Sequence, residues 1–151
     1  MEKSIFVLSL VVAFALNTQS IAAEIASPKK VQVTIAKVSD GDTVKAALNN
    51  QYVSIRLADI DCPESRTNDK SLRQAKKMNI SPEEVKKYGK EAQQELKRLL
   101  SFHEEHIYFE ETPDKVCRGE TRHVGILWAD DINVNEYMLE KTKCVSFSCS
   151  E

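Results

Sequence analysis

The strongest constraint on the fold is the alternation of apolar and polar residues in the first part of the sequence. Residues 31–35 and 53–57 alternate strictly, and residues 43–47 can form another strand between them. Alternation of this kind places the apolar side chains on one face of a β-strand. Turn signals at residues 39–42 and 49–50 separate the three segments. The pattern predicts a three-stranded meander that buries one face.

Helix signals follow further along the chain. Ser81 precedes a proline and is followed three residues later by Glu84, which makes a capping box with proline at the first helical position. Apolar residues then recur at helical spacing, so we expect one long helix from residue 82 to about residue 100. Shorter helices are expected around residues 70–78 and 135–141.

Two further segments, residues 107–110 and 124–129, are expected to be strands. Five short strands with a helix between the third and the fourth are typical of an OB-type barrel. We therefore expect an α+β domain, a five-stranded OB-fold barrel with one long and one or two short helices. Barrels of this kind offer an open face to oligonucleotides or oligosaccharides.

The first 23 residues have the three parts of a secretory signal peptide. Lys3 precedes an apolar run at residues 5–16, and small residues lead to Ala23. The run is too short for a transmembrane helix, which needs about 20 apolar residues, although a membrane anchor is the alternative interpretation. We expect an exported protein, periplasmic or secreted, with no membrane contact after cleavage and one domain at residues 31–147.

The charge balance constrains the partner only weakly. The formal net charge is −2, whereas proteins that bind nucleic acid are usually basic because their contacts release counterions. A cluster of acids that holds a metal cation would partly account for this balance, since the cation reverses the local sign.

The four cysteines are expected to form disulfides. An even count in an exported chain favours them, and no Cys-x-x-Cys pair indicates zinc. Of the three possible pairings we expect Cys62 with Cys117 and Cys144 with Cys149, the alternative being that some thiols stay free.

Carboxylates and arginines at the ends of predicted strands suggest hydrolysis of a phosphodiester. Asp42 and Asp61 are hard oxygen ligands suited to calcium or magnesium. Glu64 is placed to take a proton from a water that the metal orders. Arg56 and Arg122 can each donate paired hydrogen bonds to phosphate. Each residue alone has an ordinary structural explanation, and their joint occurrence is what favours a site.

Several segments of the sequence resemble the staphylococcal nuclease (thermonuclease) family, in the order in which that family has them. The segments are residues 38–44, 55–64, 87–92, 122–130 and 134–136. The resemblance implies an OB fold that cleaves DNA and RNA, as an endonuclease or an exonuclease, and leaves 3′-phosphate ends.

The resemblance also implies a calcium site. Asp42 and Asp61 match the family's calcium carboxylates, and the main-chain carbonyl of Cys62 matches a third ligand. Asp40 matches an acid that lies behind these ligands. The family commonly has threonine where this chain has Cys62, a change that retains the carbonyl.

Catalytic roles follow from the same resemblance. Glu64 matches the acid proposed as general base, and Arg56 and Arg122 match the arginines that hold the scissile phosphate. Two family tyrosines that contact the substrate's terminal phosphate are replaced by Glu120 and Ser148.

The segment between Glu64 and Tyr88 looks longer than in the staphylococcal enzyme. It is rich in basic residues, which would form a substrate-binding arm beside the cleft or a solvated loop. These residues are Arg66, Lys70, Arg73, Lys76 and Lys77.

The sequence thus predicts a monomeric, calcium-dependent nuclease. A non-catalytic OB-fold module that binds nucleic acid is the alternative, and a nuclease domain that acts only with a partner is a third. The histidines, His103, His106 and His123, are not expected to bind metal, because no further ligand is apparent.

Overall fold

The computed structural model describes residues 29–149. The expected signal peptide lies outside the described residues and stays a prediction. The described part contains nine short strands, three α-helices and one 3₁₀ turn. The strands are β1 (Lys30–Gln32), β2 (Thr34–Asp40), β3 (Thr43–Leu48), β4 (Gln51–Leu57), β5 (Ile60–Asp61), β6 (Ile107–Glu111), β7 (His123–Ala129), β8 (Ile132–Asn133) and β9 (Val145–Ser146). The helices are α1 (Asp69–Met78), α2 (Pro82–Phe102) and α3 (Val134–Lys141), and the turn is η1 (Pro113–Lys115).

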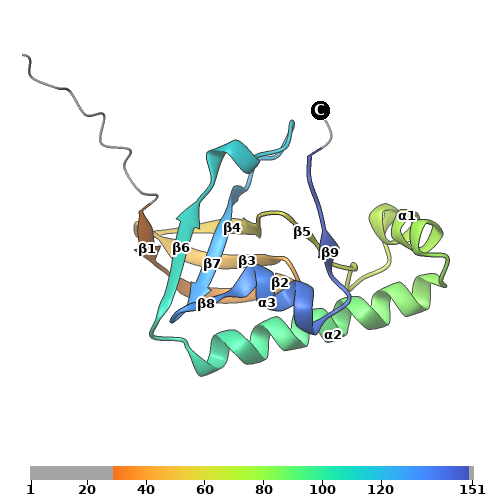
Figure 1. The fold of residues 1–151 in the computed structure, drawn as a ribbon, viewed down its shortest axis with the longest axis horizontal. Coiled ribbons are helices and arrows are strands. Elements are labelled where there is room, and N and C mark those ends of the chain that lie inside the picture. The colour runs from red at the N-terminus through yellow and green to blue at the C-terminus, as the bar shows by residue number, and fades with distance from the viewer. Residues whose placement is uncertain (1–28, 150–151) are drawn as a thin grey trace, which may run out of the picture.

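The strands form one large mixed sheet and one small one. The large sheet has the order β1-β6-β7-β4-β3-β2, with β8 added beside β7. Strands β4 and β7 are parallel, whereas the other neighbours in this sheet are antiparallel. The small sheet pairs β5 with β9. Figure 1 shows the two small strands between the large sheet and α1.

The α+β class is confirmed, but the expected five-stranded barrel is wrong. The large sheet has more strands, and within residues 29–149 no ladder joins β1 to β2, so it is not a closed barrel. The first expected strand is divided at Val33, whose N–H donates to the carbonyl of Ile107. On one side of this residue β1 pairs with β6, and on the other side β2 pairs with β3. The chain must bend at Val33, because the segments on its two sides pair with different strands.

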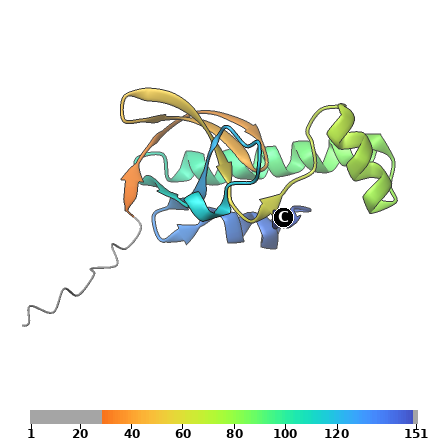
Figure 2. The ribbon, with the colours of Figure 1, turned by 90° about the horizontal axis from the view of Figure 1, so that it is seen from above.

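The one long and two short helices agree with the prediction. The capping box of Ser81 and Glu84 is present at the start of α2. Ala92, Leu96 and Leu99 are among the buried residues of α2, and they pack the helix against the core of the sheet. Figure 2 shows α2 running the length of the molecule, with α1 at its N-terminal end and the strands nearer its C-terminal end. No helix between residues 29 and 149 is long and apolar enough to cross a membrane.

All four cysteines form disulfides, but the expected pairing is wrong. The bonds join Cys62 to Cys144 and Cys117 to Cys149. The register of β5 with β9 gives the reason, because Ile60 faces Ser146 and Asp61 faces Val145. The next antiparallel pair is therefore Cys62 and Cys144. This register could not be predicted, since strands of two residues carry no recognisable alternation.

Candidate active site

The sheet brings three distant segments together at the end of β4. In the ladder between β3 and β4, Thr43 faces Arg56, so that Asp42 lies directly beside this arginine. In the parallel ladder, Ile55 is paired with His123, which places Arg122 at the same end of the sheet. Asp61 at the end of β5 and Glu64 after it lie close to the same point.

Asp42 is buried at the centre of the cluster. One carboxylate oxygen accepts a hydrogen bond from the hydroxyl of Thr43 at 2.9 Å. The other accepts one from the N–H of Cys62 at 2.9 Å and lies 2.6 Å from Nη1 of Arg56. Burial alone would raise the pKa of this carboxyl, but the charges of Arg56 and Lys70 outweigh it and hold the pKa below its usual value. Asp42 is therefore an anion in the folded protein at neutral pH.

Arg56 is held between acids on several sides, with 11% of its side chain exposed. Its Nη2 donates to the carbonyl of Ile60 at 2.9 Å and lies 3.5 Å from Asp61. Nη1 of Arg56 is buried and forms an ion pair with Asp42. The angles between these two groups do not meet the geometry of a hydrogen bond. The ring of Phe147, a residue that the sequence analysis did not single out, lies 5.8 Å from the guanidinium carbon.

Two side chains of α1 occupy the acidic side of the cluster. Nζ of Lys70 lies 2.8 Å from Asp61 Oδ1 and 2.8 Å from Glu64 Oε1. Nε2 of Gln74 donates to the carbonyl of Cys62 at 3.0 Å and to Asp61 Oδ2 at 3.3 Å, while its Oε1 accepts from the N–H of Glu64. Burial alone would lower the pKa of Lys70, but the surrounding acids raise it above its ordinary value.

Arg122 makes its main contact within its own loop. Its N–H and its Nε donate to Oε1 of Glu120, at 2.9 and 2.7 Å, and its Nη2 contacts Oε2. Nη1 reaches the hydroxyl of Thr43 at 3.4 Å. The hydrogen bonds from Arg122 lower the pKa of Glu120 to about 2. Arg122 thus reaches the cluster while its guanidinium is neutralised by Glu120.

The segment that carries Glu64 rests directly on α2. A Cβ added at Gly89 would lie 2.3 Å from the carbonyl of Glu64, so only glycine allows this approach. Asp40 accepts a hydrogen bond from the hydroxyl of Ser65 at 2.5 Å and thereby ties the end of β2 to the same segment. Asn68 donates to Oε2 of Glu64 at 2.8 Å. Glu64 is held in place from three sides.

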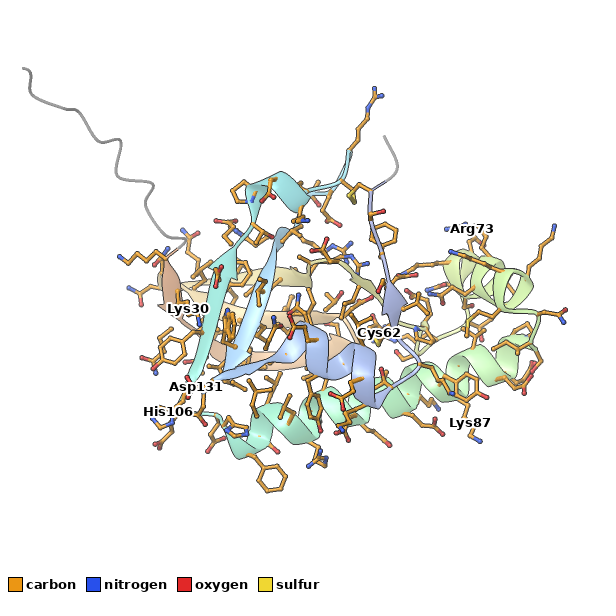
Figure 3. All side chains as sticks on the ribbon, in the orientation of Figure 1. Lys30, Cys62, Arg73, Lys87, His106 and Asp131 are labelled. Carbon is orange, nitrogen blue, oxygen red and sulfur yellow. A yellow bond between two sulfur atoms is a disulfide. The ribbon has the colours of Figure 1, made fainter. Side chains whose placement is uncertain are left out.

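Two shallow hollows flank the acids, and both carry basic residues. The first, about 340 Å³, includes Glu64 and Asp40 in its lining together with Lys37, Lys45 and Arg66. The second, about 250 Å³, is lined by Asp61, Lys70, Arg73, Gln74 and Lys77. Lys76, the remaining member of the predicted basic arm, is exposed elsewhere on α1. Figure 3 shows Cys62 between β9 and α1, with Arg73 on the outer side of α1.

The histidines lie outside the cluster. Nδ1 of His103 and Nδ1 of His106 both lie near the carboxylate of Asp130, at 2.5 and 3.1 Å, and His123 pairs with Glu111 at 2.7 Å. Over residues 29–149 the structure contains no group of three His, Cys, Asp or Glu side chains arranged to hold a metal.

The predicted calcium ligands suit a cation without forming a complete cage. Asp42, Asp61 and the Cys62 carbonyl are oxygen donors, the kind that calcium prefers. The ammonium of Lys70 already occupies a cation's place between Asp61 and Glu64. The chemistry of the donor set therefore fits a divalent ion, provided that waters or substrate complete the shell.

Gln74 is the contributor that sequence reasoning missed. It lies four residues after Lys70, and this spacing places both residues on one face of a helix. The helix was predicted from the sequence, so the face shared by Lys70 and Gln74 could have been identified. Its orientation toward Asp61 could not be predicted, because it depends on the tertiary fold.

Two comparisons relate the sequence to known proteins. The family model described as staphylococcal nuclease homologue matches residues 54–145, a range that includes Arg56, Asp61, Glu64 and Arg122. A relative from Shigella flexneri, described as micrococcal nuclease, is 35% identical over 66 residues. That match covers 37% of this chain and 37% of the relative, so the chain corresponds to little more than a third of its length.

Proposed function

Because the chain belongs to the staphylococcal nuclease homologue family, we propose that it is a calcium-dependent nuclease. It hydrolyses phosphodiester bonds in DNA and RNA and leaves 3′-phosphate ends. The proposal rests on a cluster of four charged residues at one end of β4: Asp42, Arg56, Asp61 and Glu64. Arg122, the residue before β7, lies at the same end of the sheet. Hydrolysis of a phosphodiester needs these charges. Acids bind a metal and accept a proton from the attacking water, and arginines stabilise negative charge on the phosphoryl oxygens.

The metal ligands in this proposal are Asp42, Asp61 and the main-chain carbonyl of Cys62. Calcium bound there would supply a positive charge for a phosphoryl oxygen and an ordered water. The protein keeps Asp42 ionised and oriented through Thr43, the Cys62 N–H and Arg56. Asp40 supports the site indirectly through Ser65, beside Glu64.

Glu64 is the proposed proton acceptor for the attacking water. Its carboxylate is held by Asn68 on one oxygen and by Lys70 on the other. Arg122 and Arg56 then stabilise the charge that builds up on the phosphoryl oxygens. Arg122 must exchange Glu120 for the phosphate, and its 37% exposed side chain allows this exchange.

A nucleic acid is the substrate class that the surroundings favour. The flanking hollows place basic residues on both sides of the acids, although the whole chain has a net charge of −2. A polyanion that crosses the cluster would meet Lys37, Lys45 and Arg66 on one side and Arg73 and Lys77 on the other. Such phosphate contacts position the strand without reading its sequence.

Export as a monomer is part of the proposal. The two disulfides support export, because oxidising compartments outside the cytosol are where such bonds form and persist.

A non-catalytic module that binds nucleic acid is the second candidate. The observation that favours it is the internal neutralisation of both key groups, Arg122 by Glu120 and Glu64 by Lys70. In a binding module these pairs would persist, whereas in an enzyme the substrate and metal displace them.

The test is digestion of plasmid DNA by the wild type and by Glu64→Gln, with end-group analysis of the products. The enzyme proposal expects cleavage to 3′-phosphate ends and a loss of about 100-fold or more in Glu64→Gln, since general-base catalysis contributes on that order. Glu104→Gln, beyond the far end of α2, is the matched control and should cleave normally. A gel shift by wild-type protein without any cleavage would establish the binding module instead.

A further inference from the structure

Helix α1 presents two polar side chains to the atoms that a metal would need. Nζ of Lys70 contacts one oxygen of Asp61, and Nε2 of Gln74 contacts the other oxygen and the carbonyl of Cys62. Lys70 also contacts Glu64. Every proposed metal-binding group that comes after β4 is therefore engaged by one face of α1.

We propose that Lys70 and Gln74 set the metal affinity of this site, with Lys70 acting as a tethered cation that a divalent ion must displace. The inference deepens the proposed function, because it rests on the same metal site. The Lys70 ammonium lies 2.8 Å from Oδ1 of Asp61 and 2.8 Å from Oε1 of Glu64, so it already neutralises the acid that would hold the ion. Two cations beside one carboxylate repel each other, so an ion bound through Asp61 would favour the departure of Lys70.

The fold allows this movement without unfolding α1. The helix is anchored by its buried residues, Ser71 and Ala75, and by the capping box between Asn68 and Ser71. The Lys70 side chain is 37% exposed and lines the hollow between α1 and Asp61. Its long flexible stem can move the ammonium into this hollow, while the helix keeps its contacts with α2.

Displacement carries an electrostatic penalty that the ion must overcome. Asp42, Asp61 and Glu64 face the two cations Arg56 and Lys70, so the cluster is nearly neutral before any ion arrives. Removing the Lys70 charge would leave the acids more negative and their oxygens more accessible. The substitution should therefore increase metal affinity, which is the opposite of what loss of a substrate-binding lysine would do.

The experiment measures calcium binding by calorimetry, and terbium binding by luminescence, in the absence of nucleic acid. We compare the wild type with Lys70→Met and with Lys77→Met, which removes the same charge from the same hollow. Lys77 makes no ion pair within the described residues. We expect Lys70→Met to lower the Kd about ten-fold or more, as removal of a unit charge at contact distance should. Lys77→Met should change it less than about three-fold, because an exposed charge is screened.

A second pair of variants keeps the inference testable if Lys70→Met fails to fold. Lys70→Arg retains the charge and should bind calcium within about three-fold of the wild type, for the same electrostatic reason. Gln74→Leu frees the Cys62 carbonyl and should strengthen binding by a smaller factor than Lys70→Met.

The outcomes separate this inference from the proposal on which it rests. Equal calcium affinity in the wild type, Lys70→Met and Lys77→Met would overturn the inference and leave the metal site standing. Weaker binding in Lys70→Met would also overturn it. If neither the wild type nor Lys70→Met binds calcium or terbium, the metal site itself is wrong.

Discussion

The two arginines of the candidate site occupy very different surroundings. Arg56 is 11% exposed and held between Asp42, Asp61 and the carbonyl of Ile60. Arg122 is 37% exposed, and its main partner is Glu120, two residues earlier in the same loop. The Arg56 guanidinium is buried among acids at the end of the sheet, whereas the Arg122 guanidinium pairs with a nearby residue of its own loop at the edge of the cluster.

The difference indicates that the two arginines have different roles. Arg56 compensates the buried charge of Asp42, so it holds the site together whether or not substrate is present. Arg122 is 37% exposed and paired at the edge of the cluster, so it can exchange Glu120 for another anion without disturbing the sheet. Arg56 should therefore affect stability and activity together, whereas Arg122 should affect activity more than stability.

Arg56→Ala is expected to have the largest effect. Removing this residue leaves Asp42 buried without its cation, which typically costs about 3–5 kcal/mol in the free energy of unfolding. Urea denaturation measures the loss, and DNA digestion should fall with it. The double variant Arg56→Ala with Asp42→Asn should recover part of the stability but none of the activity. Wild-type stability in Arg56→Ala would remove the distinction between the two arginines.

Arg122→Ala is expected to lower turnover about 100-fold or more, the scale found when one charge-stabilising donor is lost. Its free energy of unfolding should fall less than that of Arg56→Ala, because the Arg122 side chain is 37% exposed and that of Arg56 only 11%. Arg118→Ala, in the same loop, is the control for loss of charge and should retain activity. An Arg122→Ala protein that digests DNA at the normal rate would refute the role of this residue.

Glu120→Gln sharpens the comparison from the other side. The substitution frees the Arg122 guanidinium and removes a negative charge near the expected phosphate. We expect KM for DNA to fall roughly five-fold, the factor that corresponds to about 1 kcal/mol for charges 4 Å apart in water. A higher KM would mean that Glu120 positions Arg122 for substrate instead of competing with it. Steady-state kinetics of both proteins at the same ionic strength make the measurement.

The smallest effect concerns the pH dependence of the Glu120–Arg122 pair. The pKa of Glu120 is lowered to about 2 from 4.5, so the stability that the pair contributes is fully present above about pH 4.5. It is lost as the pH falls through about 2. The difference in unfolding free energy between the wild type and Glu120→Gln should stay constant from pH 7 to about pH 5 and then shrink. A difference that changes between pH 7 and 6 would contradict this assignment.

Much of the fold follows from local patterns. The strand expected at residues 43–47 and the alternation at residues 53–57 correspond to β3 and β4, and the capping box at Ser81 marks the start of α2. Strands β5, β8 and β9 could not be predicted, because each has two residues. The disulfide pairing failed for the same reason, since it depends on the register of β5 with β9.

The candidate site shows a similar limit. Charged residues at strand ends could be selected from the sequence, and the ladders at Arg56 account for their meeting. Lys70 was selected from the sequence as a basic residue beside the cleft, but its pairing with Asp61 and Glu64 depends on the fold and could not be foreseen. Glu120 was noticed as a substituted tyrosine, and its pairing with Arg122 gives that position a physical role.

Digestion of DNA with calcium and then with excess chelator shows whether these charges form a metal-dependent phosphodiesterase site. We expect cleavage in calcium, no cleavage after chelation, and recovery when calcium is restored. Cleavage that continues at full rate in the chelator, or DNA binding in calcium with no cleavage at all, would contradict this expectation.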